Sequence, residues 1–377
     1  MDNNTSHINI LYIMPGLGRY APNIGVLLLI KYLLKLGIGI FVVSLKKDRP
    51  DSLRHDFNKI GIKIETLSTL NPYNLLTRLK HIIKQNKIDI VHTSTFTPDL
   101  IGIALKKISK DIRVISTVRS VPSTQLPMIY GKANGKILSL VTHSILKNID
   151  FVVPHSKTIE SSLLEKGLNP EKMTMIYNGV ESNPWIDDRH ELRTILRKDL
   201  GIPDDVVLVG HVGSHNKWKR IDIILKSLAM LEKDVWFISF GKGNKTKPLK
   251  KLSHDLGMDE RVRWFGFTPD ILRYYVIMDI FVLPSYSEGL SRALLEAAAA
   301  GLPLIVSDPS SREVVKEGKN GYIIPPGGIY ELASCISRLK DAKLRKSFGQ
   351  NSLSYAHEKF SALQMAYNYY ELYQKIA

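Results

Sequence analysis

Two glutamates stand eight residues apart in the segment SYSEGLSRALLEAAAAGLPLIVSD, which covers residues 285–308. Glu288 precedes a glycine and is predicted to lie in a loop, whereas Glu296 falls inside an alanine-rich helix that begins near Leu290. Because an unpaired charge inside such a helix is costly to bury, Glu296 must reach a cleft or a hydrogen-bonding partner, and vicinal sugar hydroxyls would serve. The free N–H groups at the start of this helix can face an anion.

The two glutamates admit other interpretations. Glu288 taken alone fits a carboxylate at a helix start, where the helix dipole favours it, and Glu296 taken alone fits an ordinary surface residue. Two carboxylates on either side of a glycosidic bond are also typical of a glycoside hydrolase. The glutamates by themselves leave these alternatives open.

A second chemical feature is the basic loop within VGHVGSHNKWKRIDIILKSL, residues 209–228. A strand is predicted to end at Gly213, and a helix is predicted to begin after the loop. The N-terminus of a helix offers free N–H groups and a partial positive charge, which suit phosphate, and Lys217, Lys219 and Arg220 add full charges. The Walker pattern G-x4-G-K-[ST] is absent. A solvated basic helix start is the alternative interpretation.

The elements that must position these residues form two series of short, Ile- and Val-rich segments separated by helical stretches. The first series comprises 8–14, 37–45, 88–93, 113–118, 150–156 and 173–179, and the second comprises 206–213, 235–243, 262–267, 279–285, 302–308 and 321–326. Continuous apolar strands that alternate with helices are typical of parallel α/β sheets covered on both faces. The sequence therefore predicts an α/β protein with two Rossmann-like parallel-sheet domains.

The two series are separated by the polar, proline-containing segment ESNPWIDDRHELR at 181–193, which we expect to connect the domains. We therefore place an N-terminal domain at 1–182 and a C-terminal domain at 183–354. The remaining residues, 355–377, read as a helical tail, which we expect to pack back toward the N-terminal domain.

Most of the unusual polar and glycine residues follow the carboxyl end of a predicted strand. They include Gly16, Gly18, His92, Arg119, Ser156, Asn178, Gly213, Gly241, Phe267, Glu288 and Asp308. Open α/β sheets bind ligands in the crevice beyond these strand ends. Two such sheets with facing strand ends would form one cleft between the domains, where we expect the site. His92 fits equally a polar lining residue and a histidine whose hydrogen bonds are satisfied within the fold.

The composition is that of a globular protein with a basic half. Of 377 residues, 44% are apolar and 23% charged, and the length indicates about two domains. Residues 1–180 hold 24 lysines and arginines against 12 acidic residues, a net charge of +12, whereas 181–377 hold 28 against 24, a net charge of +4. A basic half indicates an anionic partner such as nucleic acid, anionic lipid or a phosphorylated substrate, or else a solvated lysine-rich surface. No zinc finger, RNA-recognition signature or basic zipper is present, so nucleic acid is not expected.

The apolar segment at 24–45 is the candidate for a membrane span. Two lysines interrupt it and two glycines punctuate it, so no run of 18 uncharged apolar residues remains, and a helix followed by a buried strand explains it better. The N-terminus lacks the basic and apolar pattern of a cleaved signal peptide. The lone Cys335 excludes an intramolecular disulfide and a multi-cysteine metal site.

Taken together, these segments resemble the retaining family 4 glycosyltransferases of the GT-B fold over nearly the whole chain. The most specific element is the E-x7-E motif with its flanks, LPSYSEGLSRALLEAAAAGLPLIVSD followed by REVVKEGKNGYIIPPGG. The supporting segments are IMPGLGR, DIVHTS, VVPHSKTIESSLLEKGLNPEKMTMIYNGV and GHVGSHNKWKR. Their order and spacing carry the resemblance.

The resemblance implies transfer of a sugar from a nucleotide diphosphate donor, with retention at the anomeric carbon and without a metal or other cofactor. In the C-terminal domain, Glu296 would take the ribose hydroxyls, and Glu288 would contact the hydroxyls of the donor sugar. Lys219 would hold the diphosphate and stabilise the leaving group, where negative charge accumulates. One acid is then committed to the nucleotide, which disfavours an acid/base pair of the hydrolase type.

Further residues are assigned to the site by the same resemblance. The donor site would also include Gly213, Ser214, Arg220, Gly241, Phe267, Gly289, Leu290 and Ser291. In the N-terminal domain, the loop from Gly16 through Gly18 to Arg19 would close over the phosphates and the sugar. Arg19 and His92 would lie on the acceptor side of the cleft.

Three positions depart from the family pattern. Ser214 stands where the family frequently has arginine, and Lys217 or Arg220 could compensate. The family's EGFG reads EGLS here, so Ser291 narrows the freedom of the backbone beside the donor. Arg119 stands where many members carry a histidine near the donor sugar, and we assign it to the catalytic site on that basis.

The predicted function is therefore a retaining hexosyltransferase that uses UDP-hexose or UDP-N-acetylhexosamine and a lipid-diphosphate-linked glycan acceptor, in the synthesis of lipopolysaccharide, O-antigen or capsule. We expect a cytoplasmic protein bound peripherally to the inner face of an anionic membrane through its basic half. Segment 120–147, with Lys132, Lys136 and Lys147, is the expected acceptor or membrane contact. The alternatives are a GT-B nucleotide-sugar epimerase and a non-catalytic binding protein for nucleotide sugars or nucleic acid.

Overall fold

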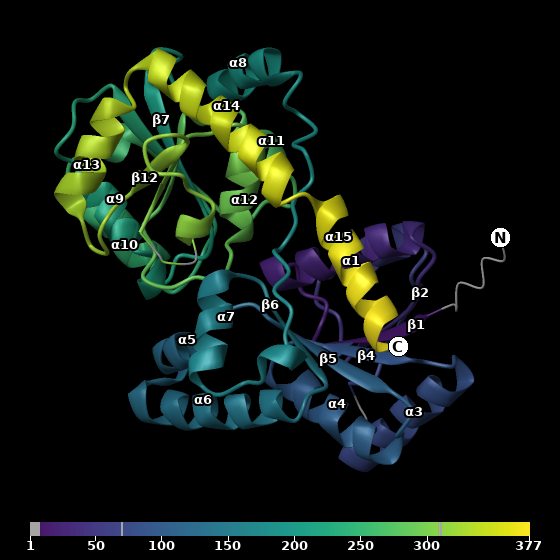
Figure 1. Ribbon diagram of the computed structural model, residues 1–377. Helices are drawn as coiled ribbons and strands as arrows, with labels where there is room; N and C mark the ends of the chain where they lie inside the picture. The colour runs from purple at the N-terminus through teal and green to yellow at the C-terminus, as the bar shows by residue number, and fades with distance from the viewer. Residues whose placement is uncertain (1–7, 69–70, 308, 310) are drawn as a thin grey trace. The chain divides into compact units, whose positions relative to one another are not determined.

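In the computed structural model, which describes residues 8–68, 71–307, 309 and 311–377, the chain forms two compact units (Figure 1). Unit 1 comprises Met1–Gly179 together with Ala362–Ala377, and unit 2 comprises Val180–Ser361. Each unit is built on one six-stranded sheet in which neighbouring strands run parallel. The predicted pair of Rossmann-like parallel sheets is confirmed.

The unit 1 sheet has the strand order β3-β2-β1-β4-β5-β6. Its strands are β1 (Asn9–Met14), β2 (Gly39–Ser44), β3 (Ile64–Thr66), β4 (Ile90–Thr93), β5 (Arg113–Val118) and β6 (Phe151–Pro154). Along β1, Ile10 and Tyr12 join the core on one face of the sheet, whereas Leu11 and Ile13 join the core on the other. Because both faces are buried, the strands are apolar without interruption, which is the pattern that identified them in the sequence.

Helices cover both faces of the unit 1 sheet. They are α1 (Ala21–Lys35), α2 (Arg54–Lys59), α3 (Pro72–Gln85), α4 (Phe96–Ile108), α5 (Pro122–Tyr130), α6 (Lys132–Lys147), α7 (Lys157–Glu165) and α15 (Ala362–Ile376), with a short 3-10 turn at Pro170–Lys172. The apolar segment considered as a membrane span divides into α1 and β2. Within the described residues, no helix combines the length and the apolar character that crossing a bilayer requires.

The C-terminal helix α15 belongs to unit 1, where it lies against α1 (Figure 1). The tail was expected to begin at residue 355, but that residue lies within α14 (Ala342–Lys359), and the chain changes unit at Ala362. The return requires a close approach, since a Cβ atom on Gly179 would lie 2.6 Å from the Cα of Ala362. A glycine at 179 therefore allows the two ends of unit 1 to pack together.

The unit 2 sheet has the order β12-β11-β10-β7-β8-β9. Its strands are β7 (Val207–Val212), β8 (Val235–Phe240), β9 (Val262–Phe265), β10 (Ile280–Leu283), β11 (Leu304–Val306) and β12 (Gly321–Ile323). Its helices are α8 (Arg189–Asp199), α9 (Ile221–Leu228), α10 (Thr246–Asp255), α11 (Leu272–Tyr275), α12 (Arg292–Ala299), α13 (Ile329–Arg338) and α14, with 3-10 turns at Lys217–Lys219, Asp259–Arg261 and Ser311–Glu313. Alanine-rich α12 packs against α14, and the alanines at 297–299 in the helix and at 300 in its C-cap are all buried.

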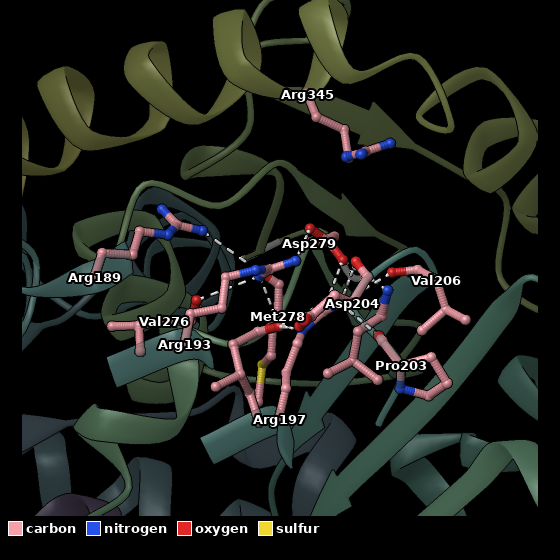
Figure 2. A network of polar contacts seen from close by, with 12 residues as sticks. Arg189, Arg193, Arg197, Pro203, Asp204, Val206, Val276, Met278, Asp279 and Arg345 are labelled. Atoms are coloured by element: carbon pink, nitrogen blue, oxygen red, sulfur yellow. Dashed lines mark hydrogen bonds and ion pairs between the residues drawn. The ribbon is translucent and has the colours of Figure 1, made fainter. Parts of the chain in front are cut away.

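A buried polar network fixes α8 to the amino ends of β7 and β10 (Figure 2). The carboxylate of Asp279 accepts from Arg193 at 2.8 Å, from Arg197 at 2.7 Å and from the backbone N–H of Leu208 at 2.8 Å. Arg197 has no exposed surface, and its guanidinium also donates to the carbonyl oxygens of residues 203, 204, 206 and 277. Because each buried donor has an acceptor, the network tolerates its burial.

Two predicted boundaries differ from the structure. The first strand series lacked β3, because a three-residue strand is too short to show an apolar pattern. The segment at 173–179 was wrongly predicted as a strand. It donates two backbone hydrogen bonds to the edge strand β6, from Thr174 to Val152 and from Ile176 to Pro154, and forms one isolated bridge rather than a continuous ladder. Asp308 lies outside the described residues.

Candidate functional site

Each sheet has a switch point, where consecutive connections leave in opposite directions. The switch lies between β1 and β4 in unit 1 and between β7 and β10 in unit 2. The loops that follow two such strands diverge, and the crevice between them is where open α/β sheets bind ligands. The predicted site residues of each unit can therefore be located relative to these two points.

At the unit 2 switch point, Lys219 and Glu288 form an ion pair of 2.6 Å between Nζ and Oε1. Lys219 lies in the loop after β7, and Glu288 lies in the loop after β10. Their side chains are 11% and 12% exposed. The ion pair joins two residues that sequence reasoning had assigned to one donor from two distant segments. An ammonium has three donors, so Lys219 can hold Glu288 and a further oxygen ligand together.

Backbone contacts between neighbouring loops position Lys219. Gly213 at the end of β7 donates to the carbonyl oxygen of Phe240 at 2.9 Å, and His215 donates to that of Lys242 at 3.2 Å. Gly241 has a φ of 137°, and a Cβ atom there would lie 1.9 Å from the carbonyl oxygen of Gly213. Only glycine fits this approach, so both predicted glycines serve to press the loops after β7 and β8 together.

The remaining predicted residues of the loop after β7 have partners of their own. Asn216 accepts from the backbone N–H of Lys219 at 3.2 Å and donates to the Ser214 hydroxyl at 2.7 Å. Arg220 has the left-handed φ of 52°, makes two 3.0 Å hydrogen bonds to Asp222, and stacks over Tyr286 at 4.4 Å. Its guanidinium is thus held by the carboxylate of Asp222. The other basic side chains of this loop, Lys219 and exposed Lys217, make no such bidentate contact.

Two histidines behind this loop were not identified from the sequence as site residues. His211 and His215 are buried, and both imidazoles lie within hydrogen-bonding distance of the Ser239 hydroxyl, at 3.3 Å and 3.0 Å. Burial lowers the pKa of His215 to about 4, and burial with Lys219 nearby lowers the pKa of His211 well below its usual value. Both are therefore neutral at pH 7. The motif GHVGSH, which places both histidines at the strand end, was the available signal.

Glu296 lies inside α12 and is 7% exposed. Its carboxylate pairs with Arg292, one helical turn earlier, at 2.7 Å, and accepts from the hydroxyl of Tyr275 at 3.0 Å. The expectation that Glu296 must find a hydrogen-bonding partner is met by Tyr275, and Arg292 balances its charge. Burial and the carboxylate of Glu296 raise the pKa of Tyr275 well above its usual value, so the phenol keeps its proton and donates.

The start of α12 follows the predicted order of residues. Glu288, Gly289 and Leu290 lie in the loop, and Ser291 is the N-cap residue, whose side chain makes no capping hydrogen bond. The first N–H groups of α12 therefore lack a side-chain cap from Ser291. Phe267, in the turn after β9, is 49% exposed.

In unit 1, the loop after β1 is held by its own side chains. Asn23 donates to the carbonyl oxygens of Gly16 at 2.9 Å and Gly18 at 2.8 Å. Arg19 pairs with Asp56 of α2 at 2.5 Å. The predicted loop residues are thus brought together at the unit 1 switch point, and the charge of Arg19 is balanced by a carboxylate.

Of the two interpretations of His92, the structure supports the histidine satisfied within the fold. One ring nitrogen lies 2.7 Å from the hydroxyl of Tyr373, and the other lies 2.7 Å from the hydroxyl of Thr117. His92 is 3% exposed, and burial lowers its pKa to about 3, so the ring is neutral. Because Tyr373 comes from α15, the C-terminal helix contributes to the strand ends of unit 1.

Arg119 follows β5. Unlike Arg19, Lys219 and Arg220, it has no acidic partner among the described residues. No hydrogen bond or ion pair of its guanidinium exists within the part of the chain that the structure describes, and its Nε atom is buried. Burial lowers its pKa. Among the described residues, no group of three or more histidine, cysteine or acidic side chains is arranged to hold a metal ion.

Comparison with known proteins places this chain in a family. The model for Glycosyltransferase Family 4 matches residues 23–183, and the model for Glycosyl transferases group 1 matches residues 193–354. Together the two matches span most of both units. The chain belongs to the family 4 glycosyltransferases.

Three similar proteins were compared with this family 4 glycosyltransferase. The O-antigen biosynthesis glycosyltransferase WclY of Escherichia coli is 27% identical over 303 residues, 80% of each chain. The UDP-Gal:alpha-D-GlcNAc-diphosphoundecaprenol alpha-1,3-galactosyltransferase of E. coli is 25% identical over 312 residues, 80% of this chain and 78% of that one. Anabaena HepE, solved in complex with UDP-glucose, has a TM-score of 0.85 at 19% identity and covers 98% of this chain and 100% of its own.

The likeness to HepE, together with the two parallel sheets, confirms the GT-B fold of this glycosyltransferase. The group 1 match contains Lys219, Glu288 and Glu296, and the family 4 match contains His92 and Arg119. The loop from Gly16 to Arg19 precedes the matched range.

Proposed function

We propose that this glycosyltransferase transfers a hexosyl or N-acetylhexosaminyl group from a UDP-linked donor to a glycan acceptor, with retention at the anomeric carbon and without a metal. The bond from the anomeric carbon to the β-phosphate oxygen breaks, and a bond to an acceptor hydroxyl oxygen forms. The products are UDP, a proton and the extended glycan. The protein's contribution is to hold the donor and to stabilise the charge of the departing UDP.

The ion pair between Lys219 and Glu288 carries this proposal. It stands at the switch point of unit 2, where a ligand is expected, and it combines a cation for the diphosphate with a carboxylate for sugar hydroxyls. Glu288 pairs with the ammonium through Oε1, and carboxylate oxygens are acceptors suited to the hydroxyl groups of a sugar. The first N–H groups of α12, next to Glu288 in the chain, suit the phosphate oxygens.

The roles of the other residues follow the family resemblance. Glu296 takes the ribose hydroxyls, and Arg292 and Tyr275 hold its carboxylate in a fixed orientation. The loop at 16–19 closes over the donor, and Arg119 belongs to the reacting sugar's surroundings. With Glu296 assigned to the nucleotide, only one acid remains near the reacting carbon, so transfer is favoured over hydrolysis by an acid/base pair.

The names of the similar proteins support the class of substrate. WclY takes part in O-antigen biosynthesis, and the galactosyltransferase uses UDP-galactose and a diphosphoundecaprenol-linked acceptor. HepE was solved with UDP-glucose. We accordingly propose a UDP-sugar as the donor and a lipid-diphosphate-linked glycan as the acceptor, in the biosynthesis of a surface polysaccharide such as O-antigen or capsule.

We further propose that the protein works in the cytoplasm at the inner face of an anionic membrane and contacts it through α5 and α6. These helices pack on each other at Gly135, where a Cβ atom would lie 2.3 Å from the Cα of Pro127. Segment 120–147 contains no acidic residue. Its exposed large apolar and basic residues are Met128, Ile129, Tyr130, Lys132, Lys136, Ile137, Leu140, Val141 and Lys147, with Ile137 and Leu140 62% and 69% exposed. Apolar side chains flanked by lysines are typical of surfaces that bind anionic lipid.

Liposome sedimentation tests the membrane contact. Replacing Lys132, Lys136 and Lys147 by glutamine should weaken binding to vesicles that contain phosphatidylglycerol, and Leu140→Ser should weaken it further. Exchange of three exposed lysines of unit 2, at positions 233, 343 and 346, serves as the charge-matched control. Equal loss of binding in both lysine variants would show that binding depends on the net charge of the protein and not on α5 and α6.

The activity itself is tested with a panel of UDP-sugars in the presence of EDTA, with and without a lipid-diphosphate-linked N-acetylglucosamine acceptor. Transfer predicts UDP release that depends on the acceptor and a glycoside with the anomeric configuration of the donor. Isomerised donor formed without acceptor would instead identify an epimerase. Donor binding without turnover in any mixture would identify a binding protein.

A further inference from the structure

A cluster of polar side chains lies at the carboxyl ends of four adjacent strands of unit 1. It is defined here as the strand-end cluster and consists of Tyr12, His92, Thr117, His155, Tyr369 and Tyr373. The tyrosines at 369 and 373 come from α15, and the other residues come from β1, β4, β5 and the end of β6. All six residues are buried.

A continuous chain of hydrogen bonds joins the strand-end cluster. The Tyr373 hydroxyl lies 2.7 Å from that of Tyr12 and 2.7 Å from His92, which in turn lies 2.7 Å from the Thr117 hydroxyl. The Tyr369 hydroxyl lies 2.9 Å from that of Thr117. On its other side, His155 lies 3.1 Å from Tyr369. Each hydroxyl therefore has its partner inside the cluster.

At neutral pH the strand-end cluster carries no charge of its own. Burial lowers the pKa of His92 to about 3 and that of His155 well below its usual value, with Arg119 adding to both effects. Burial raises the pKa of Tyr369 to about 12, and it raises those of Tyr12 and Tyr373 further. The imidazoles are thus neutral and the phenols keep their protons.

Arg119 adds one positive charge to these neutral groups. It follows β5 two residues after Thr117, and its Nη1 atom lies 3.9 Å from the position that a Cβ atom of Gly25 in α1 would occupy. The amide oxygen of Asn178 lies 3.2 Å from that same position. No carboxylate of the described residues pairs with Arg119, whereas Arg19 of the same unit has Asp56.

Arg119 as a whole is partly buried, and its Nε atom is buried without a hydrogen-bond partner among the described residues. An unpaired cation that is partly withdrawn from water lowers the stability of the fold. A neutral residue at position 119 would remove this cost, because the hydrogen bonds within the strand-end cluster do not involve Arg119. An anionic group that binds beside the guanidinium would supply the missing countercharge and take up its fork of donors.

We propose that Arg119 binds a phosphate or carboxylate group of the substrate. The strand-end cluster, which includes two tyrosines of α15, is uncharged and so leaves the charge of Arg119 uncompensated. The inference rests on the proposed function for the identity of the substrate as a sugar donor or acceptor. It makes Arg119 a determinant of specificity: the substrate carries an anion at this point. Tyr369 and Tyr373 are then positioning residues.

The anion can come from the diphosphate of the donor, from a carboxylate on the donor sugar, or from the diphosphate of a lipid acceptor. Calorimetric titration with uridine, UDP, UDP-glucose, UDP-glucuronate and farnesyl diphosphate distinguishes these sources. Arg119→Met should weaken binding of the probe that carries the recognised anion by about 10- to 100-fold, the range of a charged hydrogen bond. A loss for UDP but not uridine identifies the donor diphosphate, a loss confined to UDP-glucuronate identifies a sugar carboxylate, and a loss confined to farnesyl diphosphate identifies the acceptor.

Thermal unfolding without any probe separates this role from a structural one. Arg119→Met removes an uncompensated charge, so its Tm should rise by about 2–4 °C, whereas loss of a structural arginine lowers the Tm. Arg119→Lys keeps the charge but lacks the planar guanidinium that can donate two hydrogen bonds to one anion, so it should retain only part of the anion affinity. Arg113→Met, at the exposed amino end of the same strand, is the matched control and should change neither property.

The proposal is overturned if Arg119→Met binds every probe as tightly as the wild-type protein, or if the wild-type protein binds none of the anionic probes. Its failure is distinguishable from that of the proposed function. Sugar transfer that continues at an unchanged rate in Arg119→Met removes this inference alone, while anion binding through Arg119 in a protein that transfers no sugar removes the proposed function alone.

Discussion

Strands β7 and β10 carry charged residues at both of their ends, and the two ends differ in how these charges are satisfied. At the amino ends, Asp279 binds two arginines and a backbone N–H, and Arg197 donates to five oxygen atoms with no exposed surface (Figure 2). At the carboxyl ends, Lys219 and Glu288 form an ion pair of 2.6 Å, and the Lys219 ammonium donates to no carbonyl oxygen of the described residues.

The difference separates a structural site from a functional one on the same two strands. The network at the amino ends is saturated, so it holds α8 to the sheet and has nothing left to offer a ligand. At the carboxyl ends, the Lys219 ammonium has three donors, so it can hold a ligand oxygen in addition to Glu288. Open α/β sheets bind ligands at that same end, which agrees with this division.

The largest expected effect comes from removing Asp279, the carboxylate shared by the network at the amino ends of β7 and β10. Asp279→Ala leaves two neighbouring arginines without their shared carboxylate, and we expect it to lower the free energy of unfolding by about 3–5 kcal/mol. Denaturant unfolding measures this change. Asp255→Ala, which removes the exposed ion pair with Lys251, is the control and should cost less than about 1 kcal/mol. A similar cost for both variants would refute the contrast.

The second variant should have a large effect on activity and a smaller effect on stability than Asp279→Ala. Lys219→Met removes the cation proposed to stabilise the departing UDP, so the transfer rate should fall by about 10²- to 10³-fold. Because one ion pair is lost here, whereas Asp279→Ala deprives two arginines and a backbone N–H of their acceptor, the free energy of unfolding should fall by only about 1–3 kcal/mol. Steady-state kinetics and denaturant unfolding on one preparation check both statements. Stability loss comparable to that of Asp279→Ala would make the ion pair structural.

The third prediction separates the two glutamates. Glu296→Gln should weaken UDP binding and also lower stability by about 1–3 kcal/mol, because Arg292, whose side chain is 12% exposed, loses its charged partner. Glu288→Gln should lower the turnover number more than the affinity for UDP. Calorimetry with UDP and kinetics with the full donor measure the two properties. Equal loss of UDP affinity in both variants would contradict separate roles.

The last effect is absent at neutral pH and concerns the lowered pKa of His215. Between pH 6.5 and about 4, His215 takes up a proton in the unfolded chain but not in the folded one, so stability is full above pH 6.5 and falls as the pH decreases. The expected loss is about 1.4 kcal/mol per pH unit for this histidine. His215→Gln should flatten the fall of Tm with decreasing pH relative to the wild-type protein, after allowance for any shift at pH 7.5. A parallel fall in both proteins would show that His215 does not contribute.

Sequence reasoning predicted the two sheets because strands buried on both faces are continuously apolar, as in β1, β7 and β10. It missed β3, whose three residues show no pattern, and it read 173–179 as a strand because apolar content does not distinguish an edge segment from a ladder. The placement of α15 within unit 1 depends on packing between residues far apart in the chain, such as the contact of Gly179 with Ala362.

The candidate site was predictable in its residue types and only partly in its partners. The E-x7-E motif and the basic loop identified Lys219 and Glu288, and Arg292 stands four residues before Glu296, a spacing that itself indicates a helical ion pair. The bonds of Glu296 to Tyr275 and of His92 to Tyr373 could not be read in the same way, because 21 and 281 residues separate the partners. Whether Arg119 has a countercharge depends on every element around it, which only the folded unit reveals.

The central claim is that the ion pair at the carboxyl ends of β7 and β10 marks the donor site. Calorimetric titration of UDP into the wild-type protein, Lys219→Met and Lys226→Met tests it most directly, since Lys226 is an exposed lysine of α9 away from the strand ends. We predict that the wild-type protein and Lys226→Met bind UDP equally, and that Lys219→Met binds it at least about 10-fold more weakly. Equal affinity of all three proteins for UDP would contradict the account.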